Sequence, residues 1–187
     1  KRQVADFTAG LPLDGVLDGS PATFFYPGSS IGNFTPDEAV VFLSNVRAYC
    51  APRAGGLLIG VDGKKASAVL DAAYDDPLGV TAAFNRNVLV HLNRRFAFNF
   101  DPGAFVHRGF YNAEAGRVEM HLESAREQEV DLAGSKRRFE HAQRIHTENS
   151  CKYRPEEFEA LLGRAGFGSV RHWTSAENSY YVFYATA

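Results

Sequence analysis

The spacing of hydrophobic residues changes twice along the chain, and its first stretch, residues 23–62, has the pattern of an α/β protein. A short apolar run, TFFY, precedes helical spacing over residues 36–51 and then a continuous apolar run, LLIGVD. Thr35 followed by Pro36 is typical of a helix N-terminus. A strand, a helix and a strand buried on both faces form a βαβ unit. We therefore expect a largely parallel sheet.

The middle of the chain changes from helical to strand periodicity. Residues 64–74 and 77–96 have helical spacing, and residues 105–130 alternate as a hairpin with one solvated face. Residues 138–150 predict a third antiparallel strand. The second helix gathers its apolar residues on one side, where we expect the core: Val80, Ala83, Phe84, Val88, Leu89 and Leu92.

The last segment returns to the α/β pattern. Residues 154–166 predict a helix, and residues 170–174 and 180–185 predict strands. We therefore expect an α/β domain interrupted by an inserted lobe of helices and antiparallel strands. The predicted boundaries are 1–64 and 153–187 for the domain and 65–152 for the lobe.

Composition and charge argue against several classes of protein. The chain of 187 residues, 45% hydrophobic, can bury a core, and its net charge of -2 gives no reason to expect nucleic acid or a membrane surface as partner. No apolar run reaches the roughly 18 residues of a membrane-spanning helix, and no signal peptide opens the chain. Cys50 and Cys151 are too far apart in the sequence for a metal motif. We expect a cytoplasmic protein.

Two segments carry candidate functional residues. The elbow after the first strand, residues 27–33, lies where ligands bind in open α/β sheets, although an ordinary strand-to-helix connection explains the pattern at least as well. The segment 146–150, HTENS, places five hydrogen-bonding side chains in a row, which is unusual for a core strand. The pattern alone also fits a strand without function. Asp75-Asp76 before Pro77 is most simply a helix N-cap.

Other reactive side chains give weaker signals. The six histidines lack the spacing of metal ligands, so we expect no metal site. Ser29-Ser30 does not form the nucleophile elbow of a hydrolase, and nothing marks either cysteine as activated. By pattern alone Tyr74, Phe84 and Met120 are core residues.

Five sequence blocks extend these inferences, because together they resemble the histidine-specific Nα-methyltransferases that make trimethylhistidine (hercynine), the first step toward ergothioneine. The blocks are YPGSSIGNFTPDEA, LLIGVD, LDAAYDDPLGVTAAFNRNVLVHLNR, RVEMHLES and IHTENSCKYRPEEF. They cover essentially the whole chain in the family's order. The resemblance implies the C-terminal half of a Rossmann-like methyltransferase sheet with an inserted α+β substrate-binding lobe. It also implies S-adenosylmethionine as cofactor, L-histidine and its methylated forms as ligands, and methyl transfer to the α-amino nitrogen.

The resemblance also implies roles for individual residues. Asp6 and Phe7 look like the pair that holds the adenine of the cofactor, and Asn33 and Tyr74 look like the residues that hold the amino and carboxylate groups of the amino acid. The remaining predicted site residues read or enclose the imidazole ring: Glu148, Asn149 and Ser150 as readers, and Phe84 and Met120 as walls. No residue is assigned as a general base.

The family's N-terminal part, with its glycine-rich loop, is absent from this sequence, so we expect a fragment whose candidate partner is the missing N-terminal half of the same protein. Three alternatives stay open: a sister methyltransferase for another amino acid such as tryptophan, a non-catalytic amino-acid-binding fragment, and a structural fragment that completes another chain's sheet. Glu148 argues against tryptophan, because a carboxylate suits imidazole better than indole.

Overall fold

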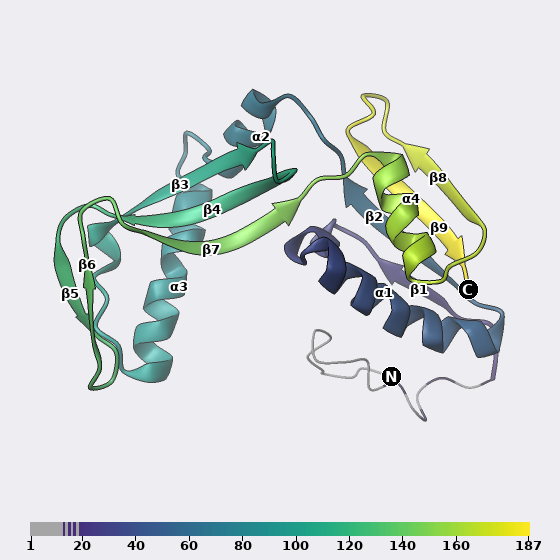
Figure 1. Cartoon of the computed structure of the whole chain (residues 1–187), viewed down its shortest axis with the longest axis horizontal. Helices are drawn as coiled ribbons and strands as arrows, with labels where there is room; N and C mark the ends of the chain where they lie inside the picture. Colours follow the sequence, from purple (N-terminus) through teal and green to yellow (C-terminus); the bar gives the residue numbers. More distant parts are fainter. Residues whose placement is uncertain (1–12, 14, 16, 18) are drawn as a thin grey trace. The chain divides into compact units, whose positions relative to one another are not determined.

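A computed structural model describes residues 13, 15, 17 and 19–187. The chain divides into two compact units (Figure 1), which are described separately: unit 1 comprises Lys1–Lys64 and Ser150–Ala187, and unit 2 comprises Lys65–Asn149. The domain boundaries expected from the sequence stay a prediction.

Unit 1 is built on a four-stranded sheet with the strand order β1-β2-β9-β8. Its strands are β1 (Thr23–Tyr26), β2 (Gly56–Asp62), β8 (Val170–Thr174) and β9 (Tyr180–Thr186). β1 and β2 are parallel, but β9 is antiparallel to both of its neighbours. Among the four described strands, β1, β2 and β8 therefore run in one direction, as a largely parallel sheet predicts, and β9 runs against them. The short link between β8 and β9 explains the hairpin, because only antiparallel strands can be joined by so few residues.

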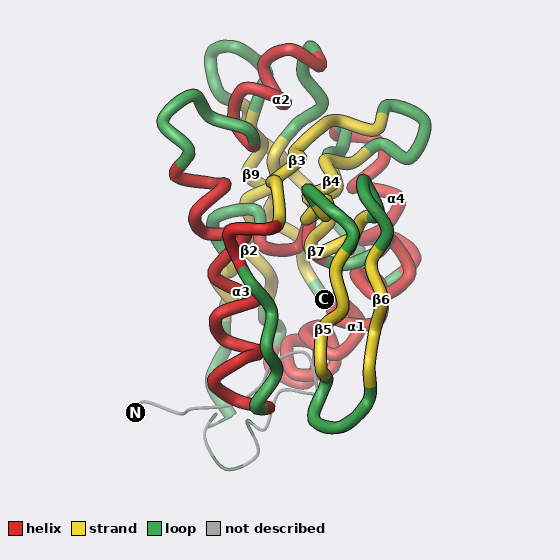
Figure 2. Tube along the Cα trace, turned by 90° about the vertical axis from the view of Figure 1, so that its left-hand side faces the viewer, coloured by secondary structure: helices red, strands yellow, loops and turns green. Residues whose placement is uncertain are grey.

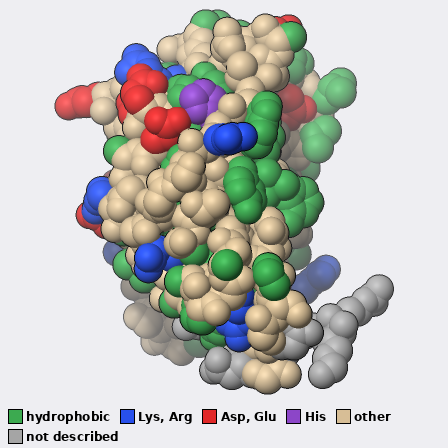
Figure 3. Space-filling model, turned by 90° about the vertical axis from the view of Figure 1, so that its right-hand side faces the viewer, with side chains coloured by type: hydrophobic (Ala, Val, Ile, Leu, Met, Phe, Trp, Pro, Cys, Tyr) green, Lys and Arg blue, Asp and Glu red, His purple; other side chains and the backbone are tan. Residues whose placement is uncertain are grey.

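Two helices cover one face of this sheet: α1 (Pro36–Cys50) and α4 (Pro155–Arg164) (Figure 1). The shared core contains Leu43 of α1, Phe158 of α4, and Ile59 and Phe183 of the sheet. No described helix covers the opposite face of the sheet. Phe25 and Trp173 are exposed, and the alternation of side chains along the strands places both on that opposite face. On the face shown in Figure 3, hydrophobic side chains gather toward the right of the view, and most of the acidic side chains lie toward the upper left.

Short 3₁₀ helices flank these elements: η1 (Ser30–Asn33) and η2 (Ala51–Arg53) in unit 1, and η3 (Pro102–Ala104) in unit 2. Thr35 is the N-cap of α1, as the sequence predicted, and reciprocal hydrogen bonds with Glu38 fix the start of the helix. The Glu38 amide donates to Thr35 Oγ1 at 3.3 Å, and the Thr35 amide donates to Glu38 Oε2 at 2.8 Å. This capping box satisfies two backbone donors that a helix start leaves without intrahelical partners.

Replacing Thr35 by Ala should lower the free energy of unfolding by about 1 kcal/mol, because the Glu38 amide loses its acceptor. Urea unfolding measures the change, and Thr35→Ser, which keeps the hydroxyl oxygen, is the matched control. Equal stability of the Ala and Ser variants would show that the cap contributes nothing.

Unit 2 combines two helices with a three-stranded antiparallel sheet and a separate hairpin. The helices are α2 (Ser67–Tyr74) and α3 (Val80–Phe96), the sheet has the order β3-β4-β7, and β5 pairs with β6. The strands are β3 (Phe105–Asn112), β4 (Arg117–Ser124), β5 (Gln128–Asp131), β6 (Lys136–Phe139) and β7 (Arg144–Cys151). α3 and the β5–β6 hairpin lie side by side (Figure 2) and share a core with Leu89, Val130 and Phe139.

The single strand expected over residues 138–150 is divided in two. Ala142 adopts a positive φ of 63°, which turns the chain between β6 and β7. The first part pairs with β5 and the second joins the β3–β4 sheet. Sequence patterning missed the turn because Ala rarely adopts this conformation.

The buried line of α3 differs from the predicted one. Leu89 is buried as expected, but Val80 and Phe84 are each 66% exposed, and Asn85 is buried instead. The reason is that the Asn85 side chain bonds partners inside the unit, so the buried line passes through residues 85 and 89. The neighbouring apolar stripe is left at the surface.

Candidate functional site

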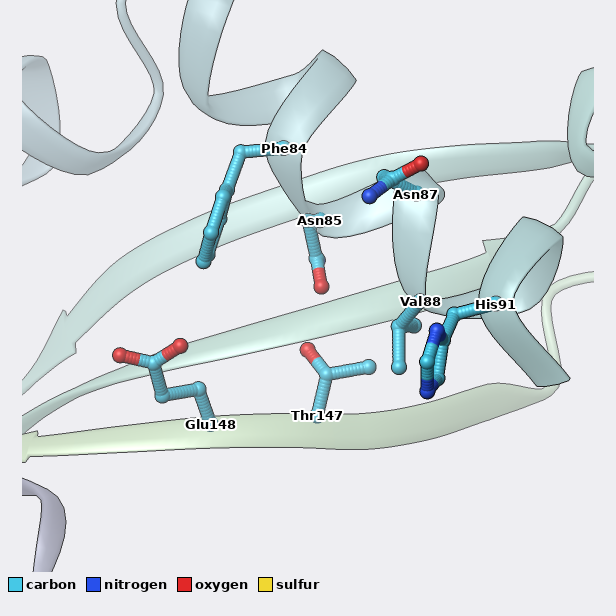
Figure 4. A pocket seen from close by; sticks show the side chains of 7 residues that line it. All are labelled: Phe84, Asn85, Asn87, Val88, His91, Thr147 and Glu148. Atoms are coloured by element: carbon cyan, nitrogen blue, oxygen red, sulfur yellow. The ribbon is translucent and has the colours of Figure 1, made fainter. Parts of the chain in front are cut away.

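A pocket of about 360 Å³ in unit 2 is formed by α3 and β7. Phe84, Asn85 and Val88 point from the helix toward Thr147 and Glu148 of the strand (Figure 4). The lining residues are Phe84, Asn85, Asn87, Val88 and His91 from α3, and Thr147 and Glu148 from β7. Its size and its mixture of apolar walls with a few polar groups suit a small ligand.

Asp76 fixes the start of α3. Its carboxylate accepts hydrogen bonds from the amides of Val80, at 3.0 Å, and Thr81, at 2.8 Å. These bonds, with that to Thr81 the largest, lower the pKa of Asp76 to about 2. The predicted N-cap position at Asp75-Asp76 is wrong, because the chain first turns through Gly79, at φ 70°, which is the N-cap of a helix that begins at Val80. The Asp76 side chain instead caps the first-turn amides from upstream.

A chain of buried hydrogen bonds connects α3, β3 and the end of α2. His107 Nε2 lies 2.7 Å from the Tyr74 carbonyl oxygen, which can only accept, so Nε2 carries a proton. Asn85 Nδ2 donates to His107 Nδ1 at 2.9 Å and to the His121 carbonyl at 3.1 Å. Asn85 and His107 are both buried. The geometry therefore defines one neutral tautomer of His107 and anchors the backbone of Tyr74.

Asn85→Ala should lower the free energy of unfolding by about 1–3 kcal/mol, because it leaves His107 Nδ1 and the His121 carbonyl without their donor. Urea unfolding measures the loss. Asn87→Ala, on the exposed side of the same helix, is the control and should change stability by less than about 0.5 kcal/mol. Equal losses in the two variants would contradict the role of the buried network.

A second polar cluster contradicts the solvated face expected for the hairpin. Glu119 is buried, and its carboxylate accepts from Arg117 Nε at 2.9 Å and from His121 Nε2 at 3.1 Å. The His121 ring stacks between Phe110 and His146, with centroids 5.4 and 4.5 Å away. Paired charges and stacked rings make this face of the sheet partly buried rather than fully solvated.

Glu119, His121 and His146 also bring three possible metal-ligand atoms within 4.8 Å of one another. A metal ion lies in the plane of each imidazole ring that binds it. The rings of His121 and His146 are stacked face to face, with 18° between their planes, so the two planes are nearly parallel and do not meet at one nearby point. Arg117 already neutralises Glu119. The observed side-chain arrangement therefore does not converge on a common ion position.

Burial is the largest influence on the pKa of His121 and lowers it below the ordinary 6.5. The hydrogen bond that His121 donates to Glu119 acts in the opposite direction and raises the pKa. His146 and Arg144 lower it further. Between 6.5 and the lower folded value, the unfolded chain binds more protons than the folded chain. The free energy of unfolding should therefore fall as the pH drops below 6.5.

His121→Gln, which keeps a donor for Glu119 but does not titrate, should lose less stability than the wild type between about pH 7.5 and about pH 5.5. Urea unfolding at the two pH values measures the difference. His141→Gln, at an exposed histidine in the β6–β7 turn, is the control and should keep the wild-type loss. A wild-type loss in His121→Gln would exclude His121 as the cause.

In unit 1, the elbow after β1 passes directly against the end of β7. A Cβ on Gly32 would lie 2.8 Å from the Cys151 carbonyl oxygen and 3.5 Å from Ser150 Oγ, so only glycine allows this approach. Asn33, the next residue along the elbow, is exposed, and Ser150 is buried. Two of the predicted substrate residues thus belong to one corner of unit 1.

The predicted cofactor residues Asp6 and Phe7 lie outside the described residues. Within unit 1, Ser29 Oγ at the elbow accepts from the Asp62 amide at 2.8 Å, and the Gly28 amide donates to the Tyr180 hydroxyl at 3.2 Å. These groups hold the elbow to β2 and β9 and are therefore already used within the protein. No geometry for the cofactor follows from them.

The pocket brings together two of the predicted residues, Phe84 and Glu148. Met120 is buried on β4, where its carbonyl accepts from Thr147 Oγ1 at 2.9 Å, and Tyr74 ends α2. Asn149 Oδ1 is buried and has no hydrogen-bond partner among the described residues. These site assignments remain predictions.

Sequence reasoning did not assign five of the pocket's residues to a site: Asn85, Asn87, Val88, His91 and Thr147. A signal was present, because residues 84, 88 and 91 repeat at helical spacing and bring side chains to one side of α3. The same spacing had been interpreted as a buried face.

Comparison with known proteins defines the family of a chain with this α/β sheet and this pocketed lobe. The family described as "Histidine-specific methyltransferase, SAM-dependent" matches residues 1–187, and the chain belongs to it. The predicted fold class, the C-terminal half of a Rossmann-like methyltransferase sheet with an inserted α+β lobe, is confirmed.

Two relatives of the chain carry the same specificity in their names. The histidine N-alpha-methyltransferase of Mycobacterium tuberculosis is 40% identical over 161 residues, which are 83% of this chain and 49% of that protein. That of Mycolicibacterium smegmatis is 42% identical over 149 residues, 79% of this chain and 46% of that protein. The chain thus spans about half the length of these relatives.

Among solved structures, the CcbJ methyltransferase from Streptomyces caelestis aligns with 98% of this chain and 62% of its own, at 14% identity and a TM-score of 0.48. No helix in the described part of the chain is both long and apolar enough to cross a bilayer.

Proposed function

We propose that the protein containing this chain transfers methyl groups from S-adenosylmethionine to the α-amino nitrogen of L-histidine, giving trimethylhistidine. The observation that carries the proposal is the carboxylate of Glu148 in the unit 2 pocket, together with the ring of Phe84 (Figure 4). A carboxylate accepts the N–H of an imidazole, and an aromatic ring packs on its face. The family and the names of the relatives support the same substrate.

Selectivity for histidine follows from the hydrogen bond that its ring can donate. An amino acid without a side-chain N–H has no donor to offer the Glu148 carboxylate, which weakens binding of that competitor. Asn149 adds a buried acceptor atom that has no partner among the described residues. Both features favour a ligand that brings hydrogen-bond donors to β7.

When bound, S-adenosylmethionine supplies an electrophilic methyl group. The residues of this chain are proposed to bind and orient the amine that receives it: Asn33 and Tyr74 hold the amino and carboxylate groups, and Glu148 holds the ring. Such positioning accounts for much of the rate of an in-line displacement. Hydrogen bonds that favour the neutral amine would assist, because only its unprotonated form attacks.

Glu148→Gln should weaken histidine binding by about tenfold or more, because a charge-assisted hydrogen bond is replaced by a neutral one, while S-adenosylmethionine affinity stays unchanged. Isothermal titration of each ligand measures both affinities. Glu114→Gln, in the exposed turn between β3 and β4, is the matched control. Equal loss of the two ligands would exclude a specific role of Glu148 in reading the imidazole.

Mass spectrometry of the products, with histidine and with tryptophan as acceptors, tests the activity itself. Methylated histidine supports the proposal, and methylated tryptophan identifies the sister activity. Histidine binding without transfer by this chain, together with transfer by the full-length protein, would define the chain as a binding fragment whose partner is the N-terminal half. The cytoplasmic location is part of the same proposal.

A further inference from the structure

Asn85 lines the unit 2 pocket from α3 and is not used by the proposed function. The residue is buried, with 3% of its surface exposed. One atom of its side-chain amide lies 2.9 Å from His107 Nδ1 and 3.1 Å from the His121 carbonyl oxygen. Because a carbonyl oxygen can only accept, the amide atom that faces both partners must be the nitrogen. These two hydrogen bonds therefore fix the orientation of the amide.

The amide oxygen of Asn85 is left on the side of the pocket. Figure 4 shows this oxygen at the end of the side chain, pointing from α3 toward the strand that carries Thr147. The Thr147 hydroxyl donates to the Met120 carbonyl at 2.9 Å, and the carboxylate of Glu148 can only accept. In the part of the chain that the structure describes, no residue donates a hydrogen bond to Asn85 Oδ1.

An acceptor in this position favours a ligand that brings an N–H. A buried acceptor without a donor is unfavourable, and a ligand N–H that reaches it offsets this cost. Rotation of the Asn85 amide toward another donor would break its bonds to His107 and to the His121 carbonyl. The oxygen is therefore held in place before a ligand arrives, and binding requires little further ordering of this side chain.

We infer that Asn85 is a substrate-binding residue whose Oδ1 accepts a ring N–H of the bound amino acid from the α3 wall of the pocket. The inference rests on the proposed function, which supplies L-histidine as the ligand. An imidazole ring carries an N–H on one nitrogen when it is neutral and on both when it is protonated. A ring of similar shape without an N–H offers Asn85 no donor.

The test compares L-histidine with thiazolyl-L-alanine, in which a ring sulfur takes the place of one ring N–H. Isothermal titration of the full-length protein with each ligand gives the ratio of the two affinities. The wild type should prefer histidine, and Asn85→Ala should reduce this preference by about tenfold, because the acceptor is lost. Asn85→Asp keeps an oxygen at this position but lacks the amide hydrogens, so it should lose stability and retain the preference.

Asn93→Ala is the matched control for a structural amide on the same helix. Asn93 Nδ2 donates to the Phe100 carbonyl at 2.7 Å, and Asn93 Oδ1 accepts from the Phe100 amide at 2.9 Å. Asn93 does not line the pocket, so its loss should lower stability and leave the preference for histidine unchanged.

A measurement on the wild type keeps the test decisive if Asn85→Ala does not fold. A carbonyl group that accepts a hydrogen bond has its carbon-13 resonance at higher frequency. The side-chain carbonyl of Asn85 should therefore shift in this direction when histidine binds, and not when thiazolyl-L-alanine binds. Absence of the shift with bound histidine would overturn the inference.

The outcomes separate the inference from the proposed function. Absence of histidine binding by the wild type would overturn the proposed function and this inference with it. A preference for histidine that persists in Asn85→Ala but is lost in Glu148→Gln would overturn the inference alone. An equal reduction of the preference in Asn85→Ala and Asn85→Asp would assign Asn85 to structure only.

Discussion

The requirement that buried polar groups be paired governs the arrangement of unit 2. The Asn85 side-chain amide donates to two buried acceptors, the His107 ring and the His121 carbonyl. His107 in turn donates to the Tyr74 carbonyl. An apolar residue at position 85 could pack against the sheet but could not fix a tautomer or a rotation. The orientation of α3, and hence the side chains that it presents to the pocket, depends on this amide.

The sequence predicted the elements of the chain better than their orientation. The strand, capped helix and strand at residues 23–62 follow from local signals that the structure uses directly, such as the Thr35–Glu38 box. The break before β7 depends on Ala142 in a left-handed conformation, for which the sequence gives no signal. The antiparallel β9 could have been predicted, because the short connection after β8 allows no other direction.

The candidate site shows the same division between chemistry and geometry. Residue type pointed to Glu148 and its neighbours, because consecutive polar side chains are unusual in a strand. The apolar spacing of α3 correctly predicted a helix, but it predicted the wrong buried side, since Phe84 is exposed and Asn85 is buried. A hydrophobic period identifies a common face of a helix, but it cannot distinguish a face that packs on the core from one that faces a pocket.

The exposed face of the unit 1 sheet has a spectroscopic consequence. Trp173 is the single tryptophan of the chain and is 55% exposed on the edge strand β8. Indole emission shifts to shorter wavelength when water leaves the ring, so the tryptophan fluorescence of this 187-residue chain reports on one surface. Any segment or partner that covers this face can be followed without a label.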